Sequence, residues 1–367
     1  MNDLEGRLKR TLQEVRDAHH DSIGSDERFE ARRSLLRRLQ RRRTRRAIGA
    51  VAAGVAVVTV AFFFVSRTSP VDRGGPDPSR TLPIASQPLD AIDVGASPSD
   101  IAVGGQGNVW TANAGDNSLT RVISSTGEID QTIQLPGAPG DIAIAAGPVW
   151  VALPELGQIT SVDFITSQPS PPIQVSTPGV EMELTVGQNV LWIVAKGEAV
   201  YRLDSGSTDP QEVPLTAHPI DIAVHDATGY VLDSNGTITT FDQATGAKGA
   251  TVSGPANARG DLIFAAGGLW NIGLGNVVKI DPASGAEIAR YDVIGEVIDL
   301  AIDPKVAWVL ESTKRGYRLV RIDRNDAAPT GDVITLPGEA VEAGISGGKL
   351  WVTDLTGGRV LAFDKLP

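Results

Sequence analysis

The sequence predicts an all-β fold, a seven-bladed β-propeller, and three regularities support this fold class. Large aromatic residues recur at separations of 38 to 43 residues over most of the 367-residue chain. An acidic residue precedes each of these aromatics by nine or ten positions. Each interval holds four short apolar runs separated by turn residues, and four strands in about 40 residues are typical of a propeller blade. A cytoplasmic helical tail and one transmembrane helix are predicted to precede the propeller.

The repeated aromatics include every tryptophan of the chain, and one tyrosine occupies the remaining position. In chain order they are Trp110, Trp150, Trp192, Tyr230, Trp270, Trp308 and Trp351. One large ring per blade is expected to fill the wedge between neighbouring sheets, which is a structural role. The acids that precede them are Asp100, Asp141, Glu183, Asp221, Asp261, Asp299 and Glu342.

The fifth repeat shows the predicted strands most clearly, over residues 261–265, 268–272, 276–281 and 287–293. In six repeats the third strand ends in aspartate, and Ile123 replaces it in the first repeat. An aspartate at that position is expected to form an Asx-turn with the backbone that follows it. These aspartates are Asp163, Asp204, Asp242, Asp281, Asp323 and Asp364.

The two ends of the repeat region predict how the ring closes. The seventh repeat stops after its third strand, at Asp364. Residues 90–94, Asp-Ala-Ile-Asp-Val, form a strand-like run before the first repeat and have no other place in the fold. We predict that this run supplies the outer strand of the last blade. The chain has no cysteine, so no disulfide can perform that closure.

The charge of the chain divides at an uncharged segment. Residues 1–46 contain 14 Lys/Arg and 8 Asp/Glu, a net charge of +6, and residues 67–367 contain the other 19 Lys/Arg and 36 Asp/Glu, a net charge of −17. Between them lie nineteen residues, 47–65, without a charged side chain. As a helix this run would span roughly 28 Å, close to the hydrocarbon thickness of a bilayer. We therefore predict a transmembrane signal-anchor helix over residues 47–66.

The flanking arginines predict the orientation of that helix. Nine arginines lie between Arg32 and Arg46, against only Arg67 and Arg73 just beyond the other end. The positive-inside rule then predicts a single-pass protein of the cell membrane, with a cytoplasmic N-terminus and an extracytoplasmic C-terminal domain. The arginine-rich stretch is expected to contact anionic lipid. A cleaved signal peptide is disfavoured, because its basic region would be 46 residues long.

The predicted organisation has four parts: a basic cytoplasmic segment (1–46), the transmembrane helix (47–66), a Pro/Gly-rich linker (67–88) and the propeller (89–367). The linker contains five prolines and is expected to be extended. The absence of cysteine excludes zinc fingers, iron–sulfur clusters and thiol nucleophiles. The overall net charge of −11 argues against a nucleic-acid partner.

Short motifs resemble known bacterial propellers. The run Trp110-Thr-Ala-Asn113, followed by Asp116-Asn-Ser-Leu-Thr120, resembles the YVTN-type motif. The run Pro98-Ser-Asp-Ile-Ala-Val103 resembles the related NHL and virginiamycin B lyase-like propellers. The resemblance covers roughly residues 89–367. It implies the propeller fold and does not specify a catalytic activity.

Some members of these groups are lyases that use histidine, glutamate and a divalent metal ion, and others are binding or scaffold domains. The predicted exported part has only His218 and His225, both in the fourth repeat, so a histidine site drawn from several blades cannot be assembled. We therefore carry over no catalytic residue, metal ligand or cofactor. A binding or scaffold role is favoured over an enzymatic one, which the sequence leaves open.

Two sets of residues are candidate binding sites. The seven acids open the innermost strands and are expected to form a ring near one mouth of the central channel, where they could bind a cation or a basic partner. Alternatively, each carboxylate accepts backbone N–H bonds from the neighbouring blade, and its repetition in every blade favours this structural role. The second candidate is asymmetric: residues 311–317 are expected to form the longest loop after a tryptophan strand, with Lys314, Arg315 and Tyr317 as the candidate binding residues on it.

The function favoured by the sequence is a membrane-anchored, extracytoplasmic binding or scaffold module for a protein, peptide or envelope ligand. One alternative is a metal-dependent lyase or lactonase with its site at the channel mouth. Another is a transmembrane signalling protein whose basic tail recruits a cytoplasmic partner. Residues 113–117 could offer oxygen ligands to calcium, but a plain turn is the favoured interpretation there.

Overall fold

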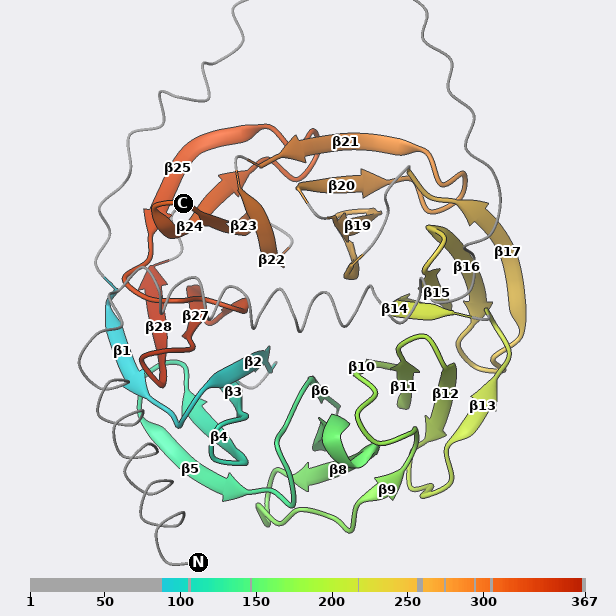
Figure 1. The fold of residues 1–367 in the computed structure, drawn as a ribbon, viewed down its shortest axis with the longest axis horizontal. Coiled ribbons are helices and arrows are strands. Elements are labelled where there is room, and N and C mark those ends of the chain that lie inside the picture. The colour runs from blue at the N-terminus through green and yellow to red at the C-terminus, as the bar shows by residue number, and fades with distance from the viewer. Residues whose placement is uncertain are drawn as a thin grey trace, which may run out of the picture. The chain divides into compact units, whose positions relative to one another are not determined.

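A computed structural model of the chain describes residues 88–364 except 105–106, 146, 217, 256–259, 274, 294 and 304–305. The described strands form seven four-stranded antiparallel sheets arranged in a ring, so the predicted seven-bladed propeller is confirmed (Figure 1). No helix among the described residues is long and apolar enough to cross a membrane. The basic segment, the transmembrane helix and all but the last residue of the linker lie outside the described residues and stay predictions.

Each blade runs from an inner strand near the ring centre to an outer strand at its rim. The first three blades are β2 (Pro98–Val103), β3 (Asn108–Asn113), β4 (Ser118–Ile123) and β5 (Ile129–Gln134); β6 (Ile142–Ile144), β7 (Pro148–Leu153), β8 (Gln158–Asp163) and β9 (Ile173–Gln174); and β10 (Met182–Gly187), β11 (Val190–Ala195), β12 (Ala199–Asp204) and β13 (Gln211–Val213). A short 3₁₀ turn, η2 (Pro154–Leu156), follows β7.

The remaining blades repeat this order. They are β14 (Pro219–His225), β15 (Thr228–Asp233), β16 (Thr237–Asp242) and β17 (Lys248–Ser253); β18 (Leu262–Ala265), β19 (Gly268–Ile272), β20 (Asn276–Ile280) and β21 (Glu287–Asp292); β22 (Glu296–Ile302), β23 (Ala307–Thr313), β24 (Gly316–Ile322) and β25 (Pro329–Thr335); and β26 (Ala343–Ser346), β27 (Lys349–Asp354), β28 (Arg359–Asp364) and β1 (Asp90–Asp93). In the fifth repeat every observed strand end lies within one residue of its predicted position.

The predicted closure of the ring is confirmed. β1 pairs antiparallel with β28, with Asp90 opposite Ala362 and Ile92 opposite Val360. The carbonyl of Val94, just after β1, accepts hydrogen bonds from Asn113 Nδ2 at 3.1 Å and from Thr120 Oγ1 at 2.6 Å. The chain therefore fastens its last blade to its first through backbone pairing and a buried polar contact.

The repeated aromatics fill the interior between blades, as predicted. Trp110, for example, is buried in one apolar cluster with Leu119 of its own blade and Val151 of the next. Five of the tryptophans are at most 1% exposed, Tyr230 is 8% exposed and Trp150 is partly buried. Because each ring packs against the adjacent sheet, the tryptophans stabilise blade-to-blade contact and are not available to a ligand.

Residues 113–117 form a turn in the described structure. The side-chain amide of Asn113 donates a hydrogen bond to the Val94 carbonyl, and Asp116 Oδ2 accepts the backbone N–H of Ala96 at 3.0 Å. Asp116 Oδ1 also accepts a hydrogen bond from Ser118 Oγ at 2.7 Å. These side chains are engaged in closing the ring, which favours the turn interpretation over a calcium site.

The expectation of a long loop over residues 311–317 is wrong. β23 continues through Thr313 and β24 begins at Gly316, which are paired directly with each other. Thr313 Oγ1 donates to the Gly316 carbonyl at 2.9 Å and accepts the N–H of Arg315 at 3.1 Å. These bonds reduce the connection to a two-residue turn, Lys314 and Arg315. The remaining residues of the expected loop are paired and belong to β23 and β24.

Candidate functional site

The seven acids lie where the sequence placed them, in or immediately before the inner strands. Glu183 is in β10, Asp100 in β2, Asp221 in β14 and Asp299 in β22, whereas Asp141, Asp261 and Glu342 directly precede β6, β18 and β26. Glu296, at the start of β22, is paired with Ser312, near the end of β23. The starts of the inner strands therefore share one edge of their sheets with the turns after the tryptophan strands, including the Lys314–Arg315 turn.

Four of these acids bind the backbone of the next blade. The side chain of Asp100 accepts the N–H of Ile142 at 2.6 Å, and the side chain of Asp141 accepts the N–H of Leu184 at 2.5 Å. The same bond joins Asp221 to Leu262, and Asp299 to Ala343 at 2.8 Å. The structural interpretation of the ring is confirmed at these four positions, because each carboxylate joins two neighbouring sheets.

Two of the four also hold their own strand. The second oxygen of Asp100 accepts the N–H of Ile101 at 2.6 Å, and that of Asp221 accepts the N–H of Ile222 at 2.7 Å. A carboxylate that accepts amides from two blades fixes both the orientation of its strand and the spacing to the next. We call the bonds from these carboxylates to the next blade the acid ties.

The other three acids differ from this pattern. Glu183 forms an ion pair with Lys196, which lies in the turn between β11 and β12 of the same blade. The backbone carbonyl of Asp261 accepts the N–H of Ile272 at 2.9 Å, and that of Glu342 accepts the N–H of Thr353 at 3.0 Å. Lys196 is a countercharge in the acidic ring that the sequence reasoning missed.

Burial changes the acidity of the ring. Burial, more than any other cause, raises the pKa of Asp100 from 3.8 to about 6 and that of Asp299 from 3.8 to about 7. Burial and the charges of neighbouring acids also raise the pKa values of Asp141, Asp221 and Glu342. Near neutral pH the ring therefore carries less negative charge than seven free carboxylates would, because removal from water penalises the ionised form.

A second set of ties, which the sequence reasoning missed, uses cations stacked on the tryptophans. Arg121 lies over the Trp110 ring and donates to the carbonyl of Phe164 in the next blade at 3.0 Å. Lys279 lies over Trp270 and donates to the carbonyl of Arg324 at 2.9 Å. In the third blade Arg202 stacks on Trp192 and donates to the Ala244 carbonyl. We call these bonds the cation ties.

The acceptors of the cation ties follow the aspartates that end the third strands. Asp163, Asp242, Asp281 and Asp323 each accept backbone N–H groups two or three residues further on, as the Asx-turn prediction requires. Asp204 instead accepts a hydrogen bond from Arg202 Nε at 2.8 Å. The side chain of Asp364 lies outside the described residues. The turns thus hold in place the carbonyls that accept the cation ties from the preceding blade.

A buried polar cluster around Glu311 lies next to the Lys314–Arg315 turn. Glu311, which is fully buried, accepts a hydrogen bond from Tyr291 of the preceding blade at 2.7 Å and from Arg318 Nε at 2.8 Å. Burial and the nearby Glu339 raise the pKa of Tyr317 to about 12. Tyr317 is partly buried against the apolar core of its blade, so the structure separates it from the exposed Lys314 and Arg315.

The two histidines are far apart. His218 precedes β14 and His225 ends it, so the strand separates them by roughly 23 Å. The His225 ring stacks on Phe264 with centroids 3.9 Å apart. Among the residues that the structure describes, no group of three or more His, Asp or Glu side chains is arranged to hold a metal ion.

No protein-family model matches the chain, and no curated protein matches it at a significant level. Solved structures do match its fold. The Cps50 (Swd1) β-propeller domain of Myceliophteria thermophila aligns with a TM-score of 0.65 and 10% identity, over 75% of this chain and 99% of that one. Virginiamycin B lyase from Staphylococcus aureus aligns with a TM-score of 0.62 and 14% identity, over 74% of this chain and 97% of that one.

The WD40 β-propeller domain of Doa1 aligns with a TM-score of 0.61 and 13% identity, over 77% of this chain and 98% of that one. At such low identity these similarities show the fold alone. The propeller fold that the resemblance to virginiamycin B lyase-like proteins implied is therefore confirmed. Assignment to the YVTN or NHL group stays a prediction.

Proposed function

We propose that this chain is a membrane-anchored, extracytoplasmic β-propeller that serves as a binding or scaffold module for a protein, peptide or envelope ligand. One observation carries the proposal. At four positions the acid that every repeat shares joins neighbouring blades, whereas Lys314 and Arg315, an adjacent basic pair found in the sixth repeat, are exposed. A rigid ring that presents varied surface groups suits recognition.

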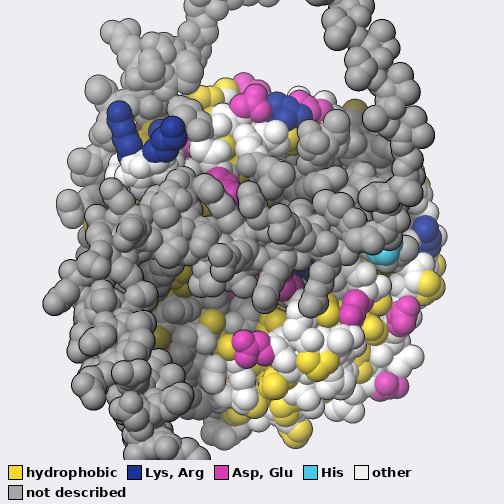
Figure 2. Space-filling model, in the orientation of Figure 1, with side chains coloured by type: hydrophobic (Ala, Val, Ile, Leu, Met, Phe, Trp, Pro, Cys, Tyr) yellow, Lys and Arg dark blue, Asp and Glu magenta, His cyan; other side chains and the backbone are white. Residues whose placement is uncertain are grey.

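The contact face proposed is the one that carries the starts of the inner strands and the Lys314–Arg315 turn. Both basic side chains are exposed and, among the described residues, neither forms an ion pair. On the face seen in Figure 2 the visible acidic side chains are spread out rather than gathered in one patch. The exposed basic turn therefore favours an anionic group of a partner.

Site-specific photocrosslinking tests this face. A photoreactive residue at position 314 of the intact protein in its own membrane is expected to give a defined adduct. The matched control replaces Lys248, an exposed lysine on the outer strand β17 of another blade. Adducts of equal yield from both positions, or none from either, would overturn the proposed contact face.

Membrane anchoring rests on the sequence. The uncharged run 47–65 and the arginines between Arg32 and Arg46 support a single-pass anchor with anionic lipid on its cytoplasmic side. Fusion of alkaline phosphatase, which is active only outside the cytoplasm, to residue 367 tests the orientation. High phosphatase activity is expected, and inactive enzyme together with a fluorescent cytoplasmic fusion would contradict the orientation.

A further inference from the structure

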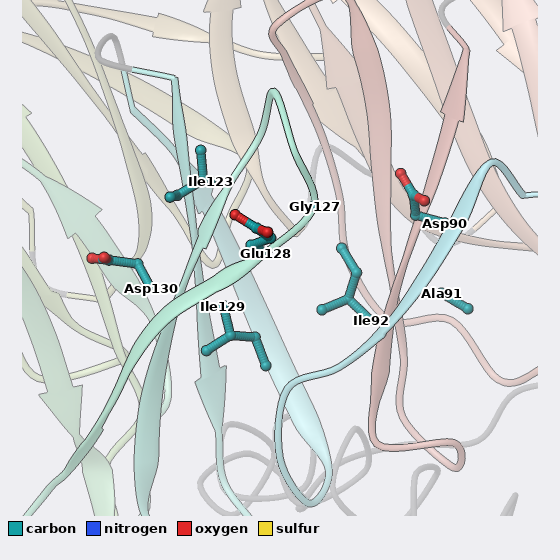
Figure 3. A pocket seen from close by; sticks show the side chains of 8 residues that line it. All are labelled: Asp90, Ala91, Ile92, Ile123, Gly127, Glu128, Ile129 and Asp130. Atoms are coloured by element: carbon teal, nitrogen blue, oxygen red, sulfur yellow. The ribbon is translucent and has the colours of Figure 1, made fainter.

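A groove lies at the seam where the last blade meets the first. Its volume is about 730 Å³, within the range of ligand-binding clefts. One wall is β1, the strand that closes the ring, and the other is the segment from Ile123 to Asp130, where β4 turns into β5 (Figure 3). The groove is therefore a product of the ring closure.

The base of the groove is apolar. Ile92 of β1 and Ile129 of β5 point into the space between the two walls, and Ile123 lies behind them (Figure 3). Ile129 is 43% exposed, so part of this apolar surface is open to solvent. At Gly127 the walls come together, since a Cβ built there would lie 3.5 Å from Ile92 Cδ1. A ligand side chain of aliphatic character would cover this exposed surface.

The rim of the groove is acidic. Its lining contains Asp90, Glu128 and Asp130 and no basic residue. Asp130 points away from the groove and forms an ion pair with Arg121. Glu128 has no side-chain partner among the described residues, and Asp90 has only Lys349 at 3.5 Å, so both carboxylates can accept further hydrogen bonds. The rim therefore favours a cationic ligand.

β1 also offers a backbone edge. It is the terminal strand of its sheet, with β28 as its one neighbour. Strand edges in natural proteins are commonly protected by lysine or proline, and the sequence of β1, Asp-Ala-Ile-Asp, contains neither. Its two aspartates repel acidic strands, including the edge of a second copy of this acidic domain, but attract a basic one.

We propose that the seam groove binds an extended, cationic peptide segment of a partner protein. The segment adds to the edge of β1 as a further strand, places an aliphatic side chain against Ile92 and Ile129, and sets a lysine or arginine beside Asp90 and Glu128. This assignment rests on the proposed binding function and gives it a partner of defined chemistry. Asp90 and Ile92 lie two positions apart, on the same face of β1, so the segment must carry its basic and its aliphatic residue two positions apart on one face.

Fluorescence anisotropy with the full chain in non-ionic detergent tests the assignment. The probe is a fluorescein-labelled octapeptide, Thr-Lys-Thr-Val-Thr-Lys-Thr-Val, in which lysine and valine alternate along one face of the strand. The controls are the same peptide with glutamate in place of lysine, and blank micelles. Saturable binding with Kd on the order of 10 μM is expected for the lysine peptide. A form of the peptide N-methylated at alternate residues should lose this binding, because it cannot pair with a strand edge.

The double variant Asp90→Asn/Glu128→Gln is expected to raise the Kd by about tenfold. The control Asp209→Asn/Glu212→Gln makes the same change of charge at the rim of the third blade, where both acids are exposed, and should leave the Kd unchanged. Equal Kd values in the two variants, or no saturable binding of the lysine peptide up to about 1 mM, would overturn the assignment.

Crosslinking separates this assignment from the function on which it rests. Photoreactive residues at position 129, in the groove, and at position 288, an exposed isoleucine of β21, are compared with the one at position 314. A partner captured from position 314 but not from 129 would overturn the groove assignment and keep the binding function. Absence of adducts from all three positions would contradict the binding function itself.

Discussion

The carboxylate of Asp299 in the sixth blade accepts the backbone N–H of Ala343 in the seventh at 2.8 Å, and Asp299 is only 5% exposed. The bond joins two inner strands at positions 44 residues apart in the chain. Equivalent acid ties recur between three other pairs of blades. The ring of acids is thus a repeated joint between sheets, and its first consequence is for stability.

Replacement of Asp299 by alanine is expected to lower the free energy of unfolding by about 2 kcal/mol, because it leaves a buried amide without its acceptor. Asp261→Ala is the matched control, since the described hydrogen bonds of Asp261 are made by its backbone. Urea denaturation followed by tryptophan fluorescence measures both variants. Equal losses in the two variants would contradict a specific role for the acid tie.

The acid ring also predicts how stability depends on pH. The folded-state pKa values of Asp100 and Asp299, about 6 and about 7, lie above the ordinary value of 3.8. The folded state therefore holds protons that the unfolded state releases. Their contribution to stability is fully present below pH 3.8 and is lost as the pH rises through 6 and 7.

Urea midpoints measured at pH 4.5 and 7.5 check this sign. The unmodified chain should be more stable at the lower pH with respect to these groups, and Asp100→Asn/Asp299→Asn should reduce the difference between the two midpoints. The Asx-turn aspartates, whose pKa values are lowered, act only below pH 3.8 and leave this window unaffected. A difference that is unchanged in the double variant would contradict the assignment to the ring.

Sequence reasoning was most successful for features that are determined by residues within one repeat unit. The strands of the fifth repeat, four of the Asx-turns and the buried tryptophans all depend on residues within about 40 positions, and these are found as predicted. The closing strand was also predictable, because an incomplete seventh repeat and an unassigned strand at residues 90–94 leave one solution.

The cation ties were missed because they join residues about 45 positions apart and require the register between blades. A signal was nevertheless present. In four repeats a basic residue stands two positions before the predicted end of the third strand (Ile123, Asp204, Asp281 or Asp323), namely Arg121, Arg202, Lys279 and Arg321. The Tyr291–Glu311 contact had no such periodicity, so the seven-fold pattern could not indicate it. The loop at 311–317 was mispredicted because strand pairing absorbed five of its seven residues.

Lys279 provides a direct test of the cation ties. It is 6% exposed, its pKa is lowered by burial, and its ammonium group donates to the Arg324 carbonyl in the next blade. Lys279→Met keeps the aliphatic stem over Trp270 and removes the donor, so the free energy of unfolding should fall by about 1–2 kcal/mol. Lys248→Met, at an exposed outer strand, should change it by less than about 0.5 kcal/mol. A more stable Lys279→Met variant would show that desolvation of the ammonium group outweighs its hydrogen bond.

The seam between the last and first blades should open before any other part of the ring. Its closing strand, β1, is the one described outer strand that no turn connects to the strand with which it pairs, and the buried Thr120 hydroxyl helps to hold it through the Val94 carbonyl at 2.6 Å. Thr120→Val preserves the shape of the side chain and removes that donor, which should cost about 1–2 kcal/mol of local stability. Hydrogen exchange at the amides of β1 should then accelerate by about tenfold, while β19 in the fifth blade keeps its protection. Thr208→Val, in an exposed loop of the third blade, should leave exchange in both strands unchanged. If β1 and β19 lost protection together in Thr120→Val, the ring would open as one cooperative unit and the seam would not be its weakest joint.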